Sequence, residues 1–234
     1  MKKKTQLLIF PLILMGMLLM LTNSCEKDEK KDDDPVPDIT VTDIDGNVYH
    51  TVIIGTQVWM LENLKVTKFN DGTAIPLVTD GTAWTNLVTA GFCWYDNNEA
   101  TYKNTYGALY NWYTVNTGKL SPAGWHVPTD AEWTTLTSYL GGLSVAGGKL
   151  KETGTTHWQS PNTGATNESG FTALPAGYRY MSTFTTLGEN GIFWSSTEDS
   201  NDYSWVRNIG YDRSDVERYP GFKRVGWSVR CVKD

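Results

Sequence analysis

The residues best suited to acid–base or metal chemistry in this 234-residue chain are its three histidines. His126 lies in the stretch GWHVPTDAEW, residues 124–133, and His50 and His157 are far from it in sequence. No spacing here is typical of a histidine metal site or of a serine–histidine–aspartate triad. We therefore interpret His126 as a structural, hydrogen-bonded residue. An imidazole in an open cleft beside an ionised partner would instead indicate an enzyme.

Acidic side chains gather in two C-terminal segments and offer the oxygen ligands that calcium prefers. If the strands around these segments are sheet neighbours, the two loops approach each other and form a calcium site. Two solvated turns are the alternative, because a chain this acidic carries carboxylates on its surface in any case. The candidate calcium ligands are Glu198, Asp199, Asn201, Asp202, Asp212, Asp215 and Glu217.

Ten tryptophans are more than the core is expected to need, and exposed indole rings can stack on the faces of sugars. Four of them, Trp59, Trp133, Trp205 and Trp227, fit buried phases of the expected elements. The candidates for stacking on a ligand are Trp84, Trp94, Trp158 and Trp194.

The sulfur chemistry of the chain depends on its compartment. Lys2, Lys3 and Lys4 precede an apolar run from Leu7 to Leu21, which is typical of an export signal and is short for a membrane span. The run ends in LTNSC, residues 21–25, which resembles a bacterial lipobox apart from Thr22 and predicts that Cys25 carries the lipid. An uncleaved anchor or ordinary secretion is the alternative.

Two further cysteines, Cys93 and Cys231, remain in the exported chain. A pair in an exported protein favours a disulfide, and two buried thiols acting as small apolar side chains are the alternative. Both interpretations stay open on the sequence alone.

Residues 26–38 contain seven acids, three lysines and two prolines without an aromatic residue, which predicts a solvated tether. The acidic run after the cysteine is similar to the surface-export signal of Bacteroidetes-type lipoproteins, although a plain spacer explains it nearly as well. The predicted organisation is a signal peptide over 1–24, the lipidated cysteine and tether over 25–38, and one folded domain over 39–234. We expect an outer-membrane lipoprotein at the cell surface.

The net charge excludes one class of partner. Removal of residues 1–24 deletes three lysines and no acids, so the formal charge changes from −6 to −9. A basic face that binds nucleic acid is therefore not expected. The chain is expected to contact the membrane through its lipid anchor.

The elements that must position these side chains begin with two hairpins over residues 38–64. Asp45-Gly46 and Gly55 mark their turns, since both sites favour positive φ angles. Asp43, Asp45 and Asn47 resemble part of a calcium loop, but Gly46 stands in the wrong place and we expect a turn.

Two helices are predicted. Tyr106, Leu109, Tyr110 and Tyr113 fall on one face of a helix over 105–115, which Asn116-Thr117-Gly118 ends. Thr129 and Glu132 form a capping box for a second helix that Gly141-Gly142 ends. The expected buried stripe of this second helix is Trp133, Leu136, Tyr139 and Leu140.

Three C-terminal strands are predicted over 192–197, 203–210 and 225–232. In the last, alternation turns one face to the core, formed by Val225, Trp227, Val229 and Cys231. Arg207 shares the inner face of the middle strand, so it needs a carboxylate partner, for which Glu132 is one candidate.

Four stretches, GALYNWYTVNTGKLSPAGWHVPTDAEW, ESGFTALPAGYRY, NGIFWSSTEDS and GWSVRCVKD, resemble the Fibrobacter succinogenes major paralogous domain family over about Thr40 to Lys233. Members are typically exported or lipid-anchored proteins without an established activity. PTDAEW and GWSVRCV are also similar, more distantly, to the formylglycine-generating (sulfatase-modifying) enzymes and to C-type lectin-like folds. The resemblance implies an α+β domain with small twisted antiparallel sheets, two main helices and long loops.

Three functions follow as expectations. The first is a non-enzymatic surface module that binds a glycan or a protein, with calcium as its only candidate cofactor. The second is an oxidase like the formylglycine-generating enzymes, with copper held by Cys93 and Cys231, although those enzymes use two cysteines near the C-terminus and this chain has only Cys231 there. The third is a purely structural envelope component.

Overall fold

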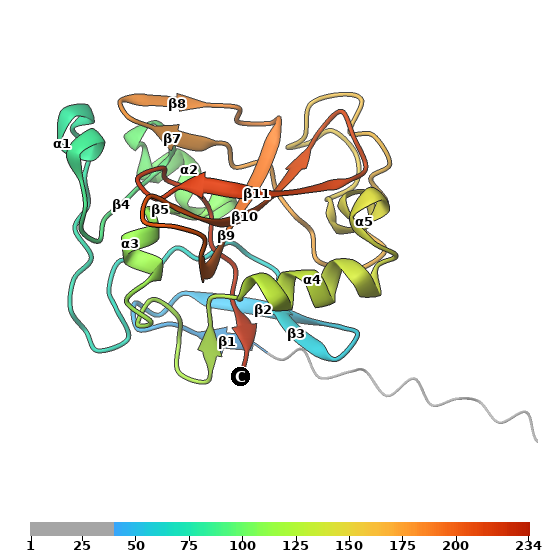
Figure 1. Cartoon of the computed structure of the whole chain (residues 1–234), viewed down its shortest axis with the longest axis horizontal. Coiled ribbons are helices and arrows are strands. Elements are labelled where there is room, and N and C mark those ends of the chain that lie inside the picture. Colours follow the sequence, from blue (N-terminus) through green and yellow to red (C-terminus); the bar gives the residue numbers. More distant parts are fainter. Residues whose placement is uncertain (1–39) are drawn as a thin grey trace, which may run out of the picture. The chain divides into compact units, whose positions relative to one another are not determined.

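The computed structural model describes residues 40–234 as small antiparallel sheets joined by long loops and short helices (Figure 1). The expected mixture of α and β elements with small antiparallel sheets is thereby confirmed. The predicted signal peptide, the predicted lipidation site Cys25 and the predicted tether lie outside the described residues. Within the described residues, no helix is long and apolar enough to cross a membrane.

The N-terminal hairpins share an antiparallel sheet with the last strand of the chain. Gly46 and Gly55, with φ of +81° and +63°, turn the chain as predicted. Asp43 Oδ1 accepts the N–H groups of Asp45 and Asn47 at 2.9 Å each, so this segment is a turn. In sheet order, the strands are β1 (Thr40–Thr42), β2 (Val48–Ile54), β3 (Gln57–Met60), β12 (Val232–Lys233) and β6 (Trp125–His126).

A three-stranded antiparallel sheet forms the C-terminal part, in the order β11 (Val216–Phe222), β10 (Tyr203–Gly210) and β9 (Asn190–Glu198). The first two predicted C-terminal strands are confirmed as β9 and β10. The third strand of the sheet is β11, which includes Glu217, a residue predicted to lie in an acidic loop. Its register pairs Arg207 with Arg218 and Ile209 with Val216.

The segment 225–232 was predicted to be one strand of a sheet, but it makes only isolated bridges up to β12. Gly226 bridges to Arg179, Trp227 to Tyr110 and Ser228 to Phe193, so the segment crosses the interior between three different partners. Its predicted inner face is buried, but so is the other face, which carries Arg230 with an exposed fraction of 0%. Alternation could not reveal this, because a segment buried on both faces has no solvent side to contrast with.

The remaining elements are short. Two pairs of short strands, β4 with β5 and β7 with β8, each form a two-stranded antiparallel sheet. Their bounds are β4 (Phe92–Cys93), β5 (Leu109–Tyr110), β7 (Tyr178–Tyr180) and β8 (Thr183–Thr185). The helices are α1 (Gly81–Asn86), η1 (Tyr95–Asn97, a 3₁₀ turn), α2 (Glu99–Tyr106), α3 (Trp112–Val115), α4 (Asp130–Tyr139) and α5 (Leu143–Leu150).

The single helix predicted over 105–115 is wrong, because the segment breaks twice. Gly107 has φ of +73°, and a Cβ at this position would lie 2.8 Å from the Asn63 side chain. The chain then pairs as β5 with β4, and Asn111 caps the short helix α3 by accepting the N–H of Thr114 at 3.1 Å. The four spaced residues therefore lie on three elements, and of them only Leu109 and Tyr110 are buried.

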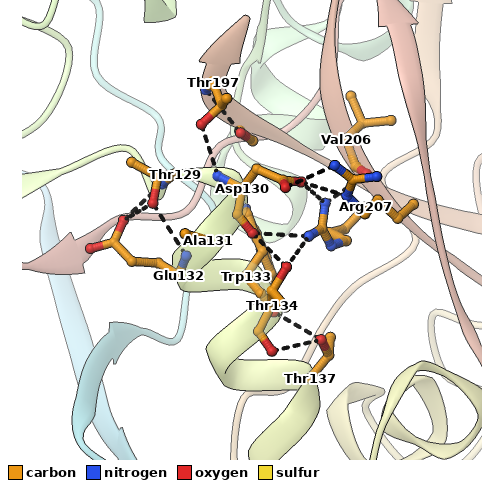
Figure 2. Close-up of polar contacts among 12 residues, drawn as sticks. Thr129, Asp130, Ala131, Glu132, Trp133, Thr134, Thr137, Thr197, Val206 and Arg207 are labelled. Carbon is orange, nitrogen blue, oxygen red and sulfur yellow. Dashed lines mark hydrogen bonds and ion pairs between the residues drawn. The ribbon is translucent and has the colours of Figure 1, made fainter. Parts of the chain in front are cut away.

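Helix α4 begins as predicted, with a capping box (Figure 2). Thr129 Oγ1 accepts the Glu132 N–H at 3.2 Å, and Glu132 Oε2 accepts the Thr129 N–H at 2.8 Å. Trp133 and Leu136 are fully buried, but Tyr139 is 66% exposed, which corrects the predicted stripe. At 3.6 residues per turn, Tyr139 lies about 120° around the axis from Trp133, outside the buried face.

The predicted carboxylate partner of Arg207 exists, but it is Asp130 (Figure 2). Arg207 is fully buried, and its Nη1 donates to Asp130 Oδ1 at 2.8 Å. Glu132 is the wrong candidate, because the capping box turns its side chain away from the sheet. Arg218 also donates to Asp130, through Nε and Nη2 at 2.9 Å each, so one carboxylate joins α4 to two strands.

Helix α4 lies between the two larger sheets (Figure 1). Trp59 of β3 and Trp133 of α4 contact each other with ring centroids 4.8 Å apart, and Trp133 contacts Phe193 of β9 at 5.6 Å. One hydrophobic cluster thus joins both sheets through the helix. The stretch around His126 therefore leads into a helix whose Trp133 packs between the two sheets.

Candidate ligand-binding cleft

The four tryptophans predicted to stack on a ligand are all core residues, which overturns that prediction. Trp84, Trp94, Trp158 and Trp194 have exposed fractions of 0, 2, 1 and 0%. Their indole N–H groups are used inside: Trp84 donates to the Arg224 carbonyl at 2.9 Å and Trp158 to the Ala173 carbonyl at 2.9 Å. Among all ten, Trp205 alone is only partly buried.

The predicted calcium loops do not meet. One connects β9 to β10 and the other connects β10 to β11, so they lie at opposite ends of β10. An extended strand of this length separates its ends by on the order of 20 Å. Across the described part of the chain, no group of three or more His, Cys, Asp or Glu side chains is placed to hold a metal ion.

Each acidic loop contacts an ammonium group of the protein itself. Lys223 Nζ pairs with Glu198 and donates to the Asn201 carbonyl at 2.8 Å, and the Asp202 carbonyl accepts the Lys223 N–H. At the other end, Lys151 Nζ donates to three carbonyls, including Gly210 at 3.0 Å and Arg213 at 2.8 Å. The remaining predicted ligands are Asp199, Asp212, Asp215 and Glu217, of which Asp212 and Glu217 pair with Arg213.

Cys93 and Cys231 are free, buried thiols. They belong to different hydrophobic clusters, Cys93 with Trp84 and Leu109, and Cys231 with the main core, where its Sγ lies 3.2 Å from Ser121 Oγ. Of the two alternatives, the structure shows buried thiols, and no disulfide joins Cys93 to Cys231. Burial raises the pKa of both thiols to about 12, which disfavours the thiolate form that binds copper.

His126 lies at the edge of a pocket of about 190 Å³ and contacts two carboxylates, the setting that would favour an enzyme. Its Nδ1 is 2.6 Å from Asp234 Oδ1 and its Nε2 is 2.8 Å from Glu132 Oε1. Partial burial lowers the pKa of His126, but the hydrogen bonds to Asp234 and Glu132 raise it above the ordinary value overall. Both ring nitrogens are engaged within the chain, so neither is free for a substrate, and the ring ties the C-terminus to α4.

The largest of the three pockets described here is an open cleft of about 320 Å³ between the β7–β8 hairpin and β11, here called the aromatic cleft. Its walls are Tyr178 and Tyr180 from β7 and Tyr219, Pro220 and Phe222 from β11. Its inner part is lined by Ile192, Gly221, Val225 and Trp227. This size is at the lower end of the usual range for small-molecule sites.

The β7 wall is positioned by a buried cation between its two tyrosines. Arg179 is 1% exposed, and its guanidinium donates to the carbonyls of Val78 at 2.6 Å and Thr79 at 3.0 Å. Because side chains alternate along a strand, the inward direction of Arg179 turns Tyr178 and Tyr180 to the opposite side. The backbone of Arg179 also exchanges two hydrogen bonds with Gly226, which fixes the hairpin against the interior segment.

Trp227 lines the cleft with an unsatisfied donor. Its side chain is 5% exposed, and its Nε1 has no hydrogen-bond partner. The ring packs against Gly221, where a Cβ would lie 2.2 Å from the ring, and its centroid is 4.4 Å from that of Trp194. A buried N–H without an acceptor carries a desolvation cost of about 1 to 3 kcal/mol, so Trp227 stabilises the fold through packing alone.

Tyr219 contributes a neutral hydroxyl. Burial raises the pKa of Tyr219 to about 12, with the nearby Glu217 and Tyr178 adding to the effect. The phenol therefore stays protonated at physiological pH and can both donate and accept a hydrogen bond. None of the side chains that line the cleft carries a charge.

A second pocket of about 190 Å³ adjoins the aromatic cleft, since Tyr180 and Phe222 line both. Its other lining residues include Trp84 and Met181. Arg224 supplies the only charged side chain among the lining residues, and the pocket is here called the Arg224 pocket.

The model of the Fibrobacter succinogenes major domain matches residues 52–233. The chain belongs to this family. The matched part of the Fibrobacter succinogenes major domain contains both walls of the aromatic cleft and the whole of α4. No curated protein and no solved structure matches the chain.

Sequence reasoning did not find the cleft of this Fibrobacter succinogenes major domain. Trp227 was assigned to the core, which is correct for its burial but not for its free N–H. The signals that could have indicated the walls are the two aromatic clusters YRYM, residues 178–181, and YPGF, residues 219–222. They lie about 40 residues apart in the sequence, so only their pairing in space identifies a site.

Proposed function

We propose that this chain is a non-enzymatic, lipid-anchored module of the cell surface that binds a glycan through the aromatic cleft. The anchoring and the outer-membrane location rest on the export signal and lipobox of residues 1–25. We also infer a C-type lectin-like fold related to the formylglycine-generating enzymes, on the motifs PTDAEW and GWSVRCV. The antiparallel sheets, the capping box and the buried C-terminal segment are compatible with that inference.

The observation that carries the proposal is a cleft walled by tyrosine rings that also holds the neutral hydroxyl of Tyr219 and no charged side chain. Sugars combine apolar C–H faces, which stack on aromatic rings, with hydroxyl and ring oxygens, which accept hydrogen bonds. Tyr178, Tyr180 and Phe222 offer the rings, and Tyr219 offers a hydroxyl group. The cleft therefore matches both halves of a sugar.

A peptide added as an extra strand fits this cleft less well. β11 is an edge strand, which could in principle pair with an extended peptide. Pro220 lies on that strand and is exposed, and it has no N–H to donate to a new neighbour. Side-chain recognition is thus favoured over main-chain pairing, which supports a glycan over a strand-like peptide.

The test is binding of the full-length chain to a broad glycan array, with and without calcium, followed by titration of the best ligand. We expect binding that does not require calcium, since no carboxylate lines the cleft. Tyr180→Ala should weaken it about tenfold through loss of a stacking ring. Tyr139→Ala is the matched control, because Tyr139 is also exposed, at 66% against 43% for Tyr180, but lies outside the cleft.

Equal effects of the two tyrosine variants, or no glycan bound at all, would contradict the proposal. Binding of a proline-rich peptide that depends on Tyr180 would likewise replace a glycan by a protein as the ligand.

A further inference from the structure

Arg224 differs from every other arginine of the chain in how its charge is used. All six arginines lie within the described residues. Arg207, Arg213 and Arg218 pair with carboxylates. Arg179 and Arg230 are buried and donate to backbone carbonyls, Arg179 to that of Val78 and Arg230 to that of Phe171.

The guanidinium of Arg224 has one weak contact of this kind. Its Nη1 donates to the Thr85 carbonyl at 3.2 Å, and its Cζ lies 5.8 Å from the centre of the Phe222 ring. No ion pair formed within residues 40–234 includes Arg224, and its side chain lines a pocket that has no carboxylate. Several N–H donors of a fixed, charged fork therefore face a concave surface.

The surroundings hold Arg224 in place and add to the positive charge. The carbonyl of Arg224 accepts the indole N–H of Trp84 at 2.9 Å, which ties its backbone to α1. Behind this pocket, the buried guanidinium of Arg179 lies 4.6 Å from the centre of the Trp84 ring. Arg179 therefore adds a second positive charge behind Trp84, and no carboxylate lies among the residues that line the pocket.

We propose that the Arg224 pocket binds an anionic group, a carboxylate or a sulfate ester, on the same glycan chain whose neighbouring sugar occupies the aromatic cleft. This inference rests on the proposed function and specifies its ligand as an acidic polysaccharide. The two pockets share Tyr180 and Phe222, so adjacent units of one chain reach both. A guanidinium binds carboxylate or sulfate oxygens through two parallel N–H groups, which gives direction as well as attraction.

The net charge of the whole chain does not favour an acidic ligand, so any preference for one must arise at the Arg224 pocket. The exported chain carries a formal charge of −9, which repels a polyanion at long range. A preference for the acidic form must therefore come from Arg224 and should weaken as salt screens it.

The experiment uses the full-length chain and two matched pairs of oligosaccharides, measured by calorimetry at low and high salt. One pair is a galacturonate oligomer and its methyl ester, and the other is a chondroitin sulfate oligomer and its desulfated form. We expect the acidic member of at least one pair to bind about tenfold more tightly. Which pair shows the difference distinguishes a carboxylate from a sulfate as the anion.

Arg224→Gln should remove this difference between the acidic and the neutral member of the pair. Lys233→Gln removes the same charge at an exposed site outside both pockets and should have no effect. Thermal unfolding of both variants, matched to the parent chain, establishes that each is folded.

The possible failures are separable. Neutral sugars that bind through Tyr180 without any preference for the acidic member overturn this inference and leave the proposed function standing. The same holds if Arg224→Gln retains the full preference. If no oligosaccharide binds through the cleft residues, the proposed function and this inference both fail.

Discussion

At the start of α4 the polar side chains bind one another, whereas in the aromatic cleft they keep unused donors. Asp130 neutralises two arginines, and Glu132 serves both the capping box and His126. One nitrogen of Arg207, its Nε, lacks a partner, but the charge of this side chain is balanced. In the aromatic cleft, the buried N–H of Trp227 has no partner among the described residues, and in the adjoining Arg224 pocket no acid balances Arg224.

The difference separates polar groups that stabilise the fold from polar groups left available to a ligand. Around α4, hydrogen bonds satisfy the first helical turn and connect three elements of one core. Around the cleft and the Arg224 pocket, the N–H of Trp227 has no acceptor, and the Arg224 guanidinium makes one long hydrogen bond, to the Thr85 carbonyl. Mutations in the two regions should therefore divide between loss of stability and loss of binding.

The largest expected effect is at Asp130. Asp130→Asn leaves Arg207 buried without a counter-charge and should reduce the free energy of unfolding by about 3 to 5 kcal/mol. Denaturant unfolding followed by circular dichroism measures this. Glu99→Gln is the control, since Glu99 pairs with Lys103 at the surface, and should cost less than about 0.5 kcal/mol. Comparable losses in the two variants would contradict the role given to Asp130.

The adjacent pair Trp194 and Trp227 sharpens the comparison further. Both indoles contribute packing, but only Trp194 uses its N–H, which donates to the Tyr110 carbonyl at 2.7 Å. Trp194→Phe should therefore lower stability by about 1 kcal/mol more than Trp227→Phe. Glycan binding by Trp227→Phe should change less than about twofold, because the Trp227 N–H is buried and an aromatic ring remains beside the cleft. Chemical unfolding and calorimetric titration of both variants provide the two readouts, and reversed stability effects would remove the argument for a free donor.

A smaller effect depends on pH. The pKa of His126 is raised in the folded chain, so its contribution to stability is complete below the unfolded value of about 6.5 and is lost as pH rises through the folded value. His126→Gln should therefore destabilise more at about pH 5.5 than at about pH 9. The side chain is 37% exposed, so the difference should be modest. A cost that does not change with pH would show that the ring acts only through packing.

The smallest expected signal is the reaction of the two buried thiols. Cys93 and Cys231 should resist alkylation in the native protein and react fully after unfolding, because both are buried and their pKa values are raised to about 12. Peptide mass spectrometry after iodoacetamide treatment, with and without denaturant, measures each cysteine separately. Fast labelling of the native protein, or a linked pair of peptides, would show that this part of the interior is not closed around free thiols.

Local chemistry explains which parts of the structure were predictable. The capping box at Thr129 and Glu132 and the turns at Gly46 and Gly55 depend on neighbouring backbone groups, so the sequence determined them. The strands β9 and β10 followed from their apolar residues, and the need of Arg207 for a carboxylate followed from the cost of burying a charge. The family also followed from the sequence, because its motifs are long and continuous.

Tertiary structure alone decided the rest, because those features depend on residues distant in the chain. Asp130 rather than Glu132 pairs with Arg207, since capping had already committed Glu132. The segment around Trp227 crosses the interior and the supposed stacking tryptophans fill the core, because burial depends on all surrounding elements. The acidic loops were kept apart by the length of β10, and the aromatic cleft arises where two clusters about 40 residues apart come together. Spacing along a chain reports local geometry, and a site built by packing is specified only once the fold has formed.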